Sequence, residues 1–218
     1  MTYDIYWGAG SPNSWRTLLG LEVKGLKYNS NLLEFSKKEH QTQEMLSLNP
    51  RGQLPILKDG NNSVFESIAI LAYLDQQNPD KPLFGSTPIE TGYIWQRVFE
   101  VENYLCTPLL DIIRPVFFDD VNDNIDAIVK AASYVHAEFK TIEPQLSARN
   151  YLAGEKISAA DVVVFPMIQA LLRALSLPEA TSLKLDFLPF ASHYPNISNW
   201  IERITTIPGY ENTYPPNW

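Results

Sequence analysis

The sequence has a single cysteine, Cys106, among 218 residues. One thiol permits no intrachain disulfide, no CxxC redox pair and no cysteine-based zinc site. The three histidines, His40, His136 and His193, show no metal-ligand spacing, so we expect no metal site. A chain that forms no intrachain disulfide suits a reducing compartment, and we expect a cytoplasmic location.

Long apolar runs and an excess of basic charge are also missing. No stretch approaches the roughly 20 apolar residues of a membrane-spanning helix, and the first residues lack the pattern of a secretion signal. Seventeen basic side chains face 25 acidic ones, which gives a formal net charge of −8. An acidic surface repels phosphate backbones and anionic lipids, so we expect neither nucleic acid nor a membrane as partner.

The first part of the chain alternates between strand and helix patterns. Short runs of strand-forming residues are separated by glycine and proline, and apolar residues at helical spacing lie between them. The pattern predicts strands at 3–7, 27–32, 54–58 and 63–66, and helices at 14–23, 36–48 and 67–76. The second of these helices is expected to start at a capping box, Ser36 with Glu39. This βαβαββα order predicts a thioredoxin-like domain over residues 1–78.

The rest of the chain follows a helical period. Residues 79–88 are rich in proline and are expected to form a linker, and residues 89–218 an all-helical domain. Its first helix is expected to start at Thr87 and Pro88, to kink at Pro108 and to end near Pro115. Further helices are predicted from apolar residues on one face between Ile125 and Leu146, from a capping box at 158–161, and after residue 195.

Five motifs carry a resemblance to a known family. They are GSPNSWR at 10–16, NPRGQLP at 49–55, FESIAI at 65–70, GEKISAAD at 154–161 and WIERITTIP at 200–208. In these motifs, and over essentially its full length, the chain resembles the soluble glutathione S-transferases. The first motif is similar to the serine-type classes such as zeta, phi and theta. The zeta pattern has cysteine where Asn13 stands, which argues against an isomerase of that kind, and the class stays unassigned.

The resemblance implies a glutathione transferase. Such an enzyme activates the glutathione thiol as thiolate and conjugates it to hydrophobic electrophiles, and a glutathione-dependent peroxidase activity fits the same site. Serine at position 11 argues against the branch that forms mixed disulfides, since a hydroxyl cannot exchange with a thiol. The resemblance also implies glutathione as co-substrate, no other cofactor, and a homodimer. Two alternatives are a non-catalytic glutathione-binding or protein-interaction module, and a specialised glutathione-dependent lyase or dehalogenase.

Ser11 is the candidate catalytic residue. It stands before the first predicted helix, where a hydroxyl donor and unpaired helix N–H groups favour a negative charge. Two other interpretations remain open, namely that Ser11 is only a helix N-cap and that Ser14 is the catalytic hydroxyl. The resemblance assigns the thiol to Ser11.

The resemblance also implies a binding site for glutathione. Pro55 in the cis form would let Leu54 offer its backbone to the cysteinyl unit of glutathione. Ser67 would bind the γ-glutamyl carboxylate and Glu66 its ammonium, with Lys38, His40 and Gln53 as further candidates. An edge-strand proline and a plain helix start are the structural alternatives. The candidates for the second-substrate pocket, with core or dimer contacts as the alternative role, are Pro12, Tyr104, Leu109, Ile113, Phe117 and Phe118.

Overall fold

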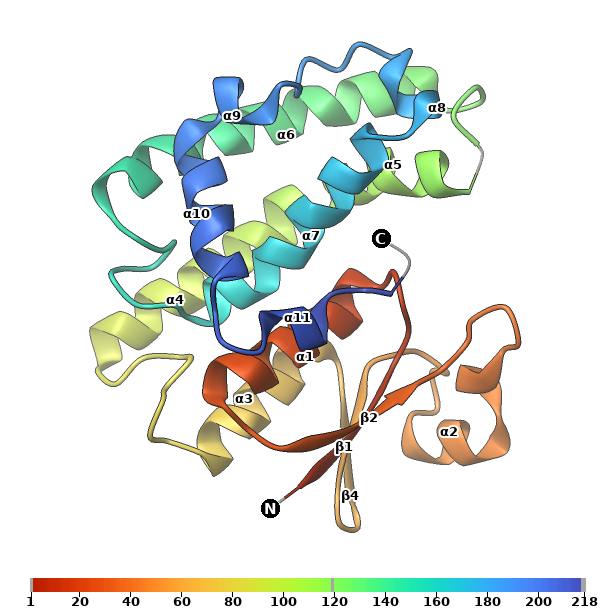
Figure 1. The fold of residues 1–218 in the computed structure, drawn as a ribbon, viewed down its shortest axis with the longest axis vertical. Helices are drawn as coiled ribbons and strands as arrows, with labels where there is room; N and C mark the ends of the chain where they lie inside the picture. Colours follow the sequence, from red (N-terminus) through yellow and green to blue (C-terminus); the bar gives the residue numbers. More distant parts are fainter. Residues whose placement is uncertain (1, 119, 217–218) are drawn as a thin grey trace. The chain divides into compact units, whose positions relative to one another are not determined.

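The computed structural model describes residues 2–118 and 120–216 (Figure 1). The chain separates into two compact units. The first comprises the residues up to Ser86 together with those from Thr205 onward, and the second comprises Thr87–Ile204. The helical period predicts that the C-terminal tail belongs to the helical domain, whereas its contacts group it with the N-terminal unit.

The first unit contains a four-stranded sheet in the order β2-β1-β3-β4. β1 pairs in parallel with β2 and antiparallel with β3, and β3 pairs antiparallel with β4. The strands are β1 Tyr3–Trp7, β2 Tyr28–Leu32, β3 Ile56–Asp59 and β4 Asn62–Phe65. With helices α1 Pro12–Lys24, α2 Gln43–Leu48 and α3 Ser67–Gln77, they give the predicted thioredoxin-like order, which is confirmed.

Side chains on the two faces of the sheet build two small cores. Ile5 and Leu57 point to one face, where they pack with Leu18 of α1 and Ile70 of α3. The next residue of β3, Ile56, points to the opposite face. There it packs in a cluster with Met45 and Leu48 of α2, and with Leu54 and Tyr6. The alternation therefore places α1 and α3 on one face of the sheet and α2 on the other.

The predicted capping box at Ser36 and Glu39 is wrong. The Glu39 carboxylate accepts a hydrogen bond from the Glu34 N–H at 2.8 Å, and a short 3₁₀ turn, η1 Glu39–Gln41, follows. α2 begins later, after Thr42, whose hydroxyl accepts from the Met45 N–H at 3.4 Å. Ser36 and Thr42 are both residue types that cap helices. Because the Glu39 carboxylate bonds to the Glu34 N–H, it does not complete a box with Ser36, and Thr42 caps α2 instead.

The long first helix of the second unit is interrupted earlier than predicted. α4 Pro88–Glu100 continues into a π-helical turn, η2 Val101–Leu105, and then into α5 Cys106–Phe117. Pro108 lacks the N–H that would bond to the carbonyl four residues earlier, and its ring crowds that turn. The irregularity therefore falls in the turn before the proline, as a single π-helical turn inside a longer helix.

In the second unit, most residues of α7 Ala159–Leu175 are buried, and the helix packs against α4 and α5. α6 Ile125–Ala148 contributes the predicted apolar face, except that Ile125, at its first position, is exposed and Ile142 is only partly buried. The predicted helix after residue 195 is α10 Pro195–Thr205. Three further short helices were not predicted: α8 Pro178–Thr181 and α9 Phe190–His193 in this unit, and α11 Tyr210–Thr213 in the first unit.

The predicted capping box of α7 is present and organises a buried network. Asp161 accepts from the Ser158 N–H and hydroxyl at 2.9 Å each, from the Leu152 N–H at 2.9 Å and from the Trp200 indole N–H at 2.8 Å. Burial raises the pKa of the Asp161 carboxyl, and the four hydrogen bonds oppose that rise. One carboxylate thereby joins α7, α10 and the loop before α7.

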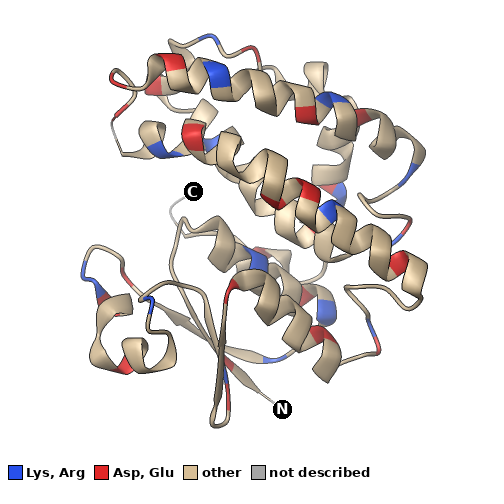
Figure 2. Ribbon diagram, turned by 180° about the vertical axis from the view of Figure 1, so that it is seen from behind, with Lys and Arg blue, Asp and Glu red and all other residues tan. Residues whose placement is uncertain are grey.

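Charged residues are interspersed along the helices and loops of both units, with acidic segments between the basic ones (Figure 2). Within residues 2–118 and 120–216, no helix has both the length and the apolarity that a membrane crossing requires.

Candidate functional site

Ser11 is the N-cap of α1. Its backbone is extended, with φ −87° and ψ 114°, and its hydroxyl oxygen accepts from the Ser14 N–H at 3.2 Å. Pro12 follows as the first helical residue, and the Ser11 carbonyl accepts from the Trp15 N–H at 3.0 Å. Ser11 is partly exposed, in contrast to the buried residues that follow it in α1.

The cap uses only part of what a serine hydroxyl offers. A hydroxyl has one donor hydrogen and two acceptor lone pairs. The bond from Ser14 takes an acceptor site on Ser11, which leaves the hydroxyl hydrogen able to donate to another group. Helix N-capping and donation to an anion are therefore compatible roles for the same side chain.

Ser14 lies in a different environment. It is fully buried, and its hydroxyl oxygen accepts from the Gly8 N–H at 3.2 Å, which ties α1 to the loop after β1. A ligand thiol in solvent has no access to an atom with this burial. The geometry gives Ser14 a structural contact and leaves Ser11 as the accessible hydroxyl of the pair.

The Leu54–Pro55 peptide bond is cis, as expected. The segment before it is held by Asn49, which is buried and which the sequence analysis did not single out. Its amide nitrogen donates to the Gln53 carbonyl at 2.8 Å, and its side-chain oxygen accepts from the Arg51 N–H at 3.0 Å. Asn49 is the first residue of the NPRGQLP motif, so its place in that motif could have indicated a role in holding the segment before Pro55.

Glu66 and Ser67 form the start of α3. Glu66 precedes the helix with φ 69° and ψ 114°, a conformation that a non-glycine residue rarely adopts. Ser67 is the first helical residue and is buried, while Glu66 is exposed. Backbone strain of this kind is often retained at binding sites. The turn presents the N–H groups of the first turn of α3 beside an exposed carboxylate.

Lys38 and His40 lie in the turn before α2. Lys38 is exposed and left-handed, with φ 53°, and His40 is half-buried with its ring 5.1 Å from the ring of Phe35. The His40 Nδ1 atom is buried and has no hydrogen-bond partner within the described chain. Phe35 also covers the loop after β1, because a Cβ on Gly8 would stand 2.2 Å from its ring. Phe35, which the sequence analysis missed, therefore links His40 to the loop that leads to Ser11.

The candidates for the second-substrate pocket differ in exposure. Leu109 and Ile113 are buried in the helical unit. This burial agrees with the alternative role that the sequence left open for them, as core residues. Tyr104, Phe117 and Phe118 are exposed, and Pro12 is half-buried in the first unit. Tyr104 also lines a hollow of about 210 Å³, which is otherwise formed mainly by Arg97, Glu100, Val101, Glu138 and Gln145.

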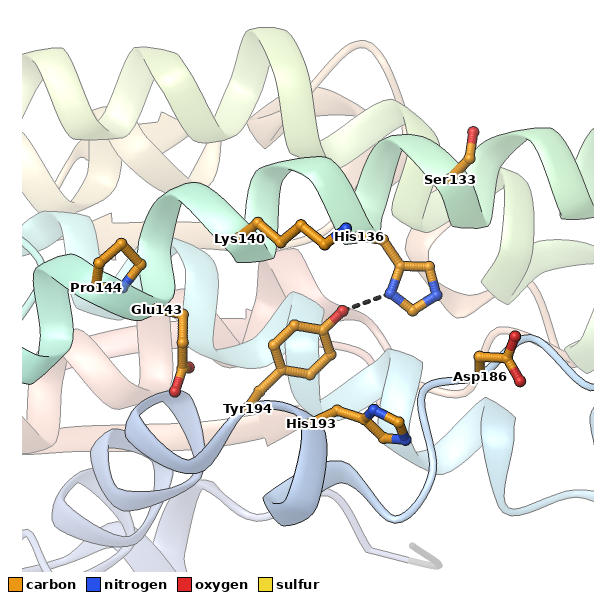
Figure 3. A pocket seen from close by; sticks show the side chains of 8 residues that line it. All are labelled: Ser133, His136, Lys140, Glu143, Pro144, Asp186, His193 and Tyr194. Atoms are coloured by element: carbon orange, nitrogen blue, oxygen red, sulfur yellow. Dashed lines mark hydrogen bonds between the residues drawn. The ribbon is translucent and has the colours of Figure 1, made fainter.

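A second hollow of the helical unit, of about 600 Å³, surrounds His136 (Figure 3). The His136 Nε2 atom lies 2.8 Å from the Leu185 carbonyl, so it carries the proton, and Nδ1 pairs with the Tyr194 hydroxyl. The His136 ring stacks on Phe187 at 4.0 Å. His136 therefore fastens the segment before α10 to α6. The described residues contain no group of three His, Cys, Asp or Glu side chains able to hold a metal ion.

Comparison with known proteins identifies the family. The family model "Glutathione S-transferase, N-terminal domain" matches residues 1–76, and "Glutathione S-transferase, C-terminal domain" matches residues 105–208. Glutathione S-transferase A of Pleuronectes platessa is 33% identical over 220 residues, covering 98% of this chain and 92% of that protein.

Solved structures show the same relationship. A glutathione S-transferase from the Antarctic clam Laternula elliptica superimposes with a TM-score of 0.82 at 32% identity, covering all of this chain and 94% of that one. Glutathione transferase F2 of Populus trichocarpa shares the fold at 22% identity, with a TM-score of 0.81 and coverage of 97% and 96%. The chain belongs to the glutathione S-transferase family.

Proposed function

We propose that this chain conjugates glutathione to hydrophobic electrophiles and that Ser11 stabilises the reacting thiolate. The observation that carries the proposal is the state of the Ser11 hydroxyl. It is accessible, it stands at the N-terminus of α1, and its cap with Ser14 uses an acceptor site while the donor hydrogen is left for a ligand.

The energy required is within reach of this arrangement. A free thiol has a pKa of about 8.5, and each unit by which that pKa is lowered requires about 1.4 kcal/mol of preferential stabilisation of the anion. A hydrogen bond to a charged group contributes about 1.5–3 kcal/mol, and a helix N-terminus about 0.3–1 kcal/mol. Together they support a thiol pKa lowered by one to two units.

The chemical step needs no resident cofactor. The thiol first releases its proton to water, and the resulting thiolate sulfur attacks an electrophilic carbon and forms a carbon–sulfur bond. In a substitution the halide leaves with the bonding electron pair; in an addition the electron pair of the double bond moves to the adjacent carbon, which then takes a proton from water. Ser11 donates to the sulfur before the attack and keeps its own proton throughout.

Glutathione would bind along the cis turn and the start of α3. Leu54 would pair its backbone with the cysteinyl unit, as an added strand pairs with a sheet edge. Ser67 and the first N–H groups of α3 would bind the γ-glutamyl carboxylate, and Glu66 would attract the ammonium. The exposed side chains of Lys38 and Gln53, together with His40, supply further polar contacts.

The proposal includes a homodimer. Large apolar side chains of α4 are exposed, namely Ile89, Tyr93 and Phe99, and so are Val129 and Tyr134 of α6. A contiguous patch formed by such side chains would mark an interaction surface. Light scattering should give about twice the chain mass of 24.8 kDa. A concentration-independent mass of one chain would contradict the dimer and leave the proposed chemistry unaffected.

Steady-state conjugation with an aryl halide tests the proposed role of Ser11. Ser11→Ala should lower kcat at least tenfold while the KM for glutathione changes little, because the binding contacts lie on other segments. An unchanged kcat in a folded Ser11→Ala protein would remove Ser11 from the mechanism. Absence of conjugation by the natural protein, with glutathione still bound, would favour a non-catalytic binding module.

A further inference from the structure

The C-terminal segment 209–214 packs on α1, the helix that carries Ser11 (Figure 1, dark blue against red). The Trp15 indole N–H donates to the Thr213 hydroxyl oxygen at 2.9 Å. Trp15 is 2% exposed and Thr213 is fully buried, so this hydrogen bond is shielded from water. The Thr213 hydroxyl in turn donates to the Tyr210 carbonyl at 2.8 Å, which fixes its orientation.

Ring contacts and a second polar contact hold the same segment. The ring of Tyr214 stands edge-on to Trp15 at 5.7 Å. Nearer the end of α1, the Asn212 amide donates to the Glu22 carboxylate at 3.2 Å. Gly209 begins the segment with φ 83°, and a Cβ there would stand 2.0 Å from a Glu22 oxygen. The segment is therefore attached to both the first and the last turn of α1.

Trp15 connects this attachment to the proposed catalytic hydroxyl. Its backbone N–H donates to the Ser11 carbonyl at 3.0 Å, so the two residues share the first turn of α1. The Trp15 indole N–H is held by the Thr213 hydroxyl, and the Ser11 hydroxyl is held by the Ser14 N–H. A change in the Trp15 side chain therefore acts on the turn that aims Ser11.

We propose that Thr213 is a positioning residue for Ser11. The inference rests on the proposed role of Ser11 and adds that the C-terminal segment sets the orientation of its hydroxyl. Without the Thr213 hydroxyl, the buried indole N–H loses the hydrogen bond that fixes the Trp15 side chain against the C-terminal segment. The indole or the segment then shifts, and a misplacement of about 1 Å at a reacting group lowers rates by up to about a hundredfold.

The test compares two substitutions of Thr213. Thr213→Val keeps the shape and removes the hydroxyl, whereas Thr213→Ser keeps the hydroxyl. We expect Thr213→Val to lower kcat roughly tenfold with an unchanged KM for glutathione, and to raise the pH at which bound glutathione ionises, followed by thiolate absorbance. Thr213→Ser should behave as the natural protein. The matched control is Asn212→Ala, which removes only the contact to Glu22 and should leave the thiolate titration unchanged.

A purely structural role predicts a different outcome. Thr213→Val would then lower the unfolding midpoint while the folded protein keeps its kcat and its thiolate titration, and that result would overturn the inference. If Thr213→Val does not fold, Trp15→Phe removes the donor of the same hydrogen bond. The inference then requires that Trp15→Phe raise the pH midpoint at which bound glutathione ionises, and an unchanged midpoint would overturn it.

Ser11→Ala separates this inference from the proposed function. If Ser11→Ala raises the pH midpoint at which bound glutathione ionises, and the Thr213 and Trp15 variants do not, only the positioning role of Thr213 is lost. If Ser11→Ala leaves the titration unchanged, the proposed role of Ser11 fails.

Discussion

The backbone N–H of Ser14 donates to the hydroxyl oxygen of Ser11 at 3.2 Å, while the Ser14 hydroxyl accepts from Gly8 in the buried interior. The two serines of the first motif thus divide two tasks. Ser14 anchors α1 to the loop before it, and Ser11 completes the helix cap with a hydroxyl that still has a hydrogen to donate. The sequence alone left both serines as candidates for the catalytic hydroxyl, and their difference in burial favours Ser11.

This division predicts opposite outcomes for two alanine substitutions. Ser14→Ala removes a buried hydrogen bond and should lower the free energy of unfolding by about 1–2 kcal/mol, with kcat largely kept. Ser11→Ala removes the cap, at about 1 kcal/mol, and should also lower kcat at least tenfold. Urea unfolding and initial rates measure the two effects. A loss of kcat in Ser14→Ala with full activity in Ser11→Ala would reverse the assignment.

A buried ion pair is expected to dominate the electrostatic stability of the N-terminal unit. Lys24 Nζ lies 2.8 Å from Asp75 Oδ1, with side-chain exposures of 1% and 7%, and it also donates to the Lys81 carbonyl at 2.7 Å. Asp75 accepts from the Leu83 N–H at 2.7 Å. Lys24→Met leaves the Asp75 charge buried without its cation, and should lower the free energy of unfolding by about 3–5 kcal/mol.

The chain offers a matched control for this prediction. Lys37 and Glu34 also stand 2.8 Å apart, but their side chains are 63% and 52% exposed. Exposed pairs contribute little to stability, so Lys37→Met should leave the urea midpoint nearly unchanged. Equal shifts for Lys24→Met and Lys37→Met would contradict the claim that burial makes the difference.

The Asp161 network should be equally sensitive in the helical unit. Asp161→Asn keeps the size of the side chain but replaces one of the two oxygens, each of which now accepts two hydrogen bonds, with a donor. Unpaired buried donors should lower the free energy of unfolding by about 3 kcal/mol. Ser158→Ala, which removes one of the four bonds, is the milder comparison. Thermal unfolding that is unchanged in Asp161→Asn would show that the network contributes little.

Tyr210 should titrate late. Burial, and secondarily the charge of Tyr214, raise the pKa of Tyr210 to about 12 from its ordinary value of 10.0. An acid whose pKa is higher in the folded state than in the unfolded state stabilises the fold below the ordinary pKa, and this contribution is lost as the pH rises from 10 toward 12. Tyr210→Phe should therefore remove a late component from the tyrosinate absorbance titration and reduce the loss of stability in that range. A titration curve that lost its component near pH 10 instead would contradict the shift.

Local signals in the sequence were sufficient for most of the fold. The glycine and proline breakers, the start at Thr87 and Pro88, and the strand-forming residues at 3–7 each act over a few residues. The prediction of a capping box at Ser36 was wrong because a second cap residue, Thr42, lies six residues later, and because Glu39 accepts its hydrogen bond from Glu34. The interruption near Pro108 was foreseen, but its place in the preceding turn depends on how the helix absorbs a missing hydrogen bond.

The parts of the site that were missed depend on contacts distant in sequence. Phe35 matters because its ring covers Gly8, and no pattern within either segment shows that approach. Trp15 and Thr213 are 198 positions apart, and the tail that carries Thr213 has no periodicity of its own. The choice between Ser11 and Ser14 likewise depended on burial, which tertiary packing decides.

The central claim is that Ser11 lowers the pKa of bound glutathione, and a pH titration of thiolate absorbance tests it most directly. With the natural protein, the bound thiol should ionise one to two pH units below its free value of about 8.5, and Ser11→Ala should move the midpoint back toward that value. An unshifted thiol in the natural protein, or a midpoint that does not move in Ser11→Ala, would contradict the account.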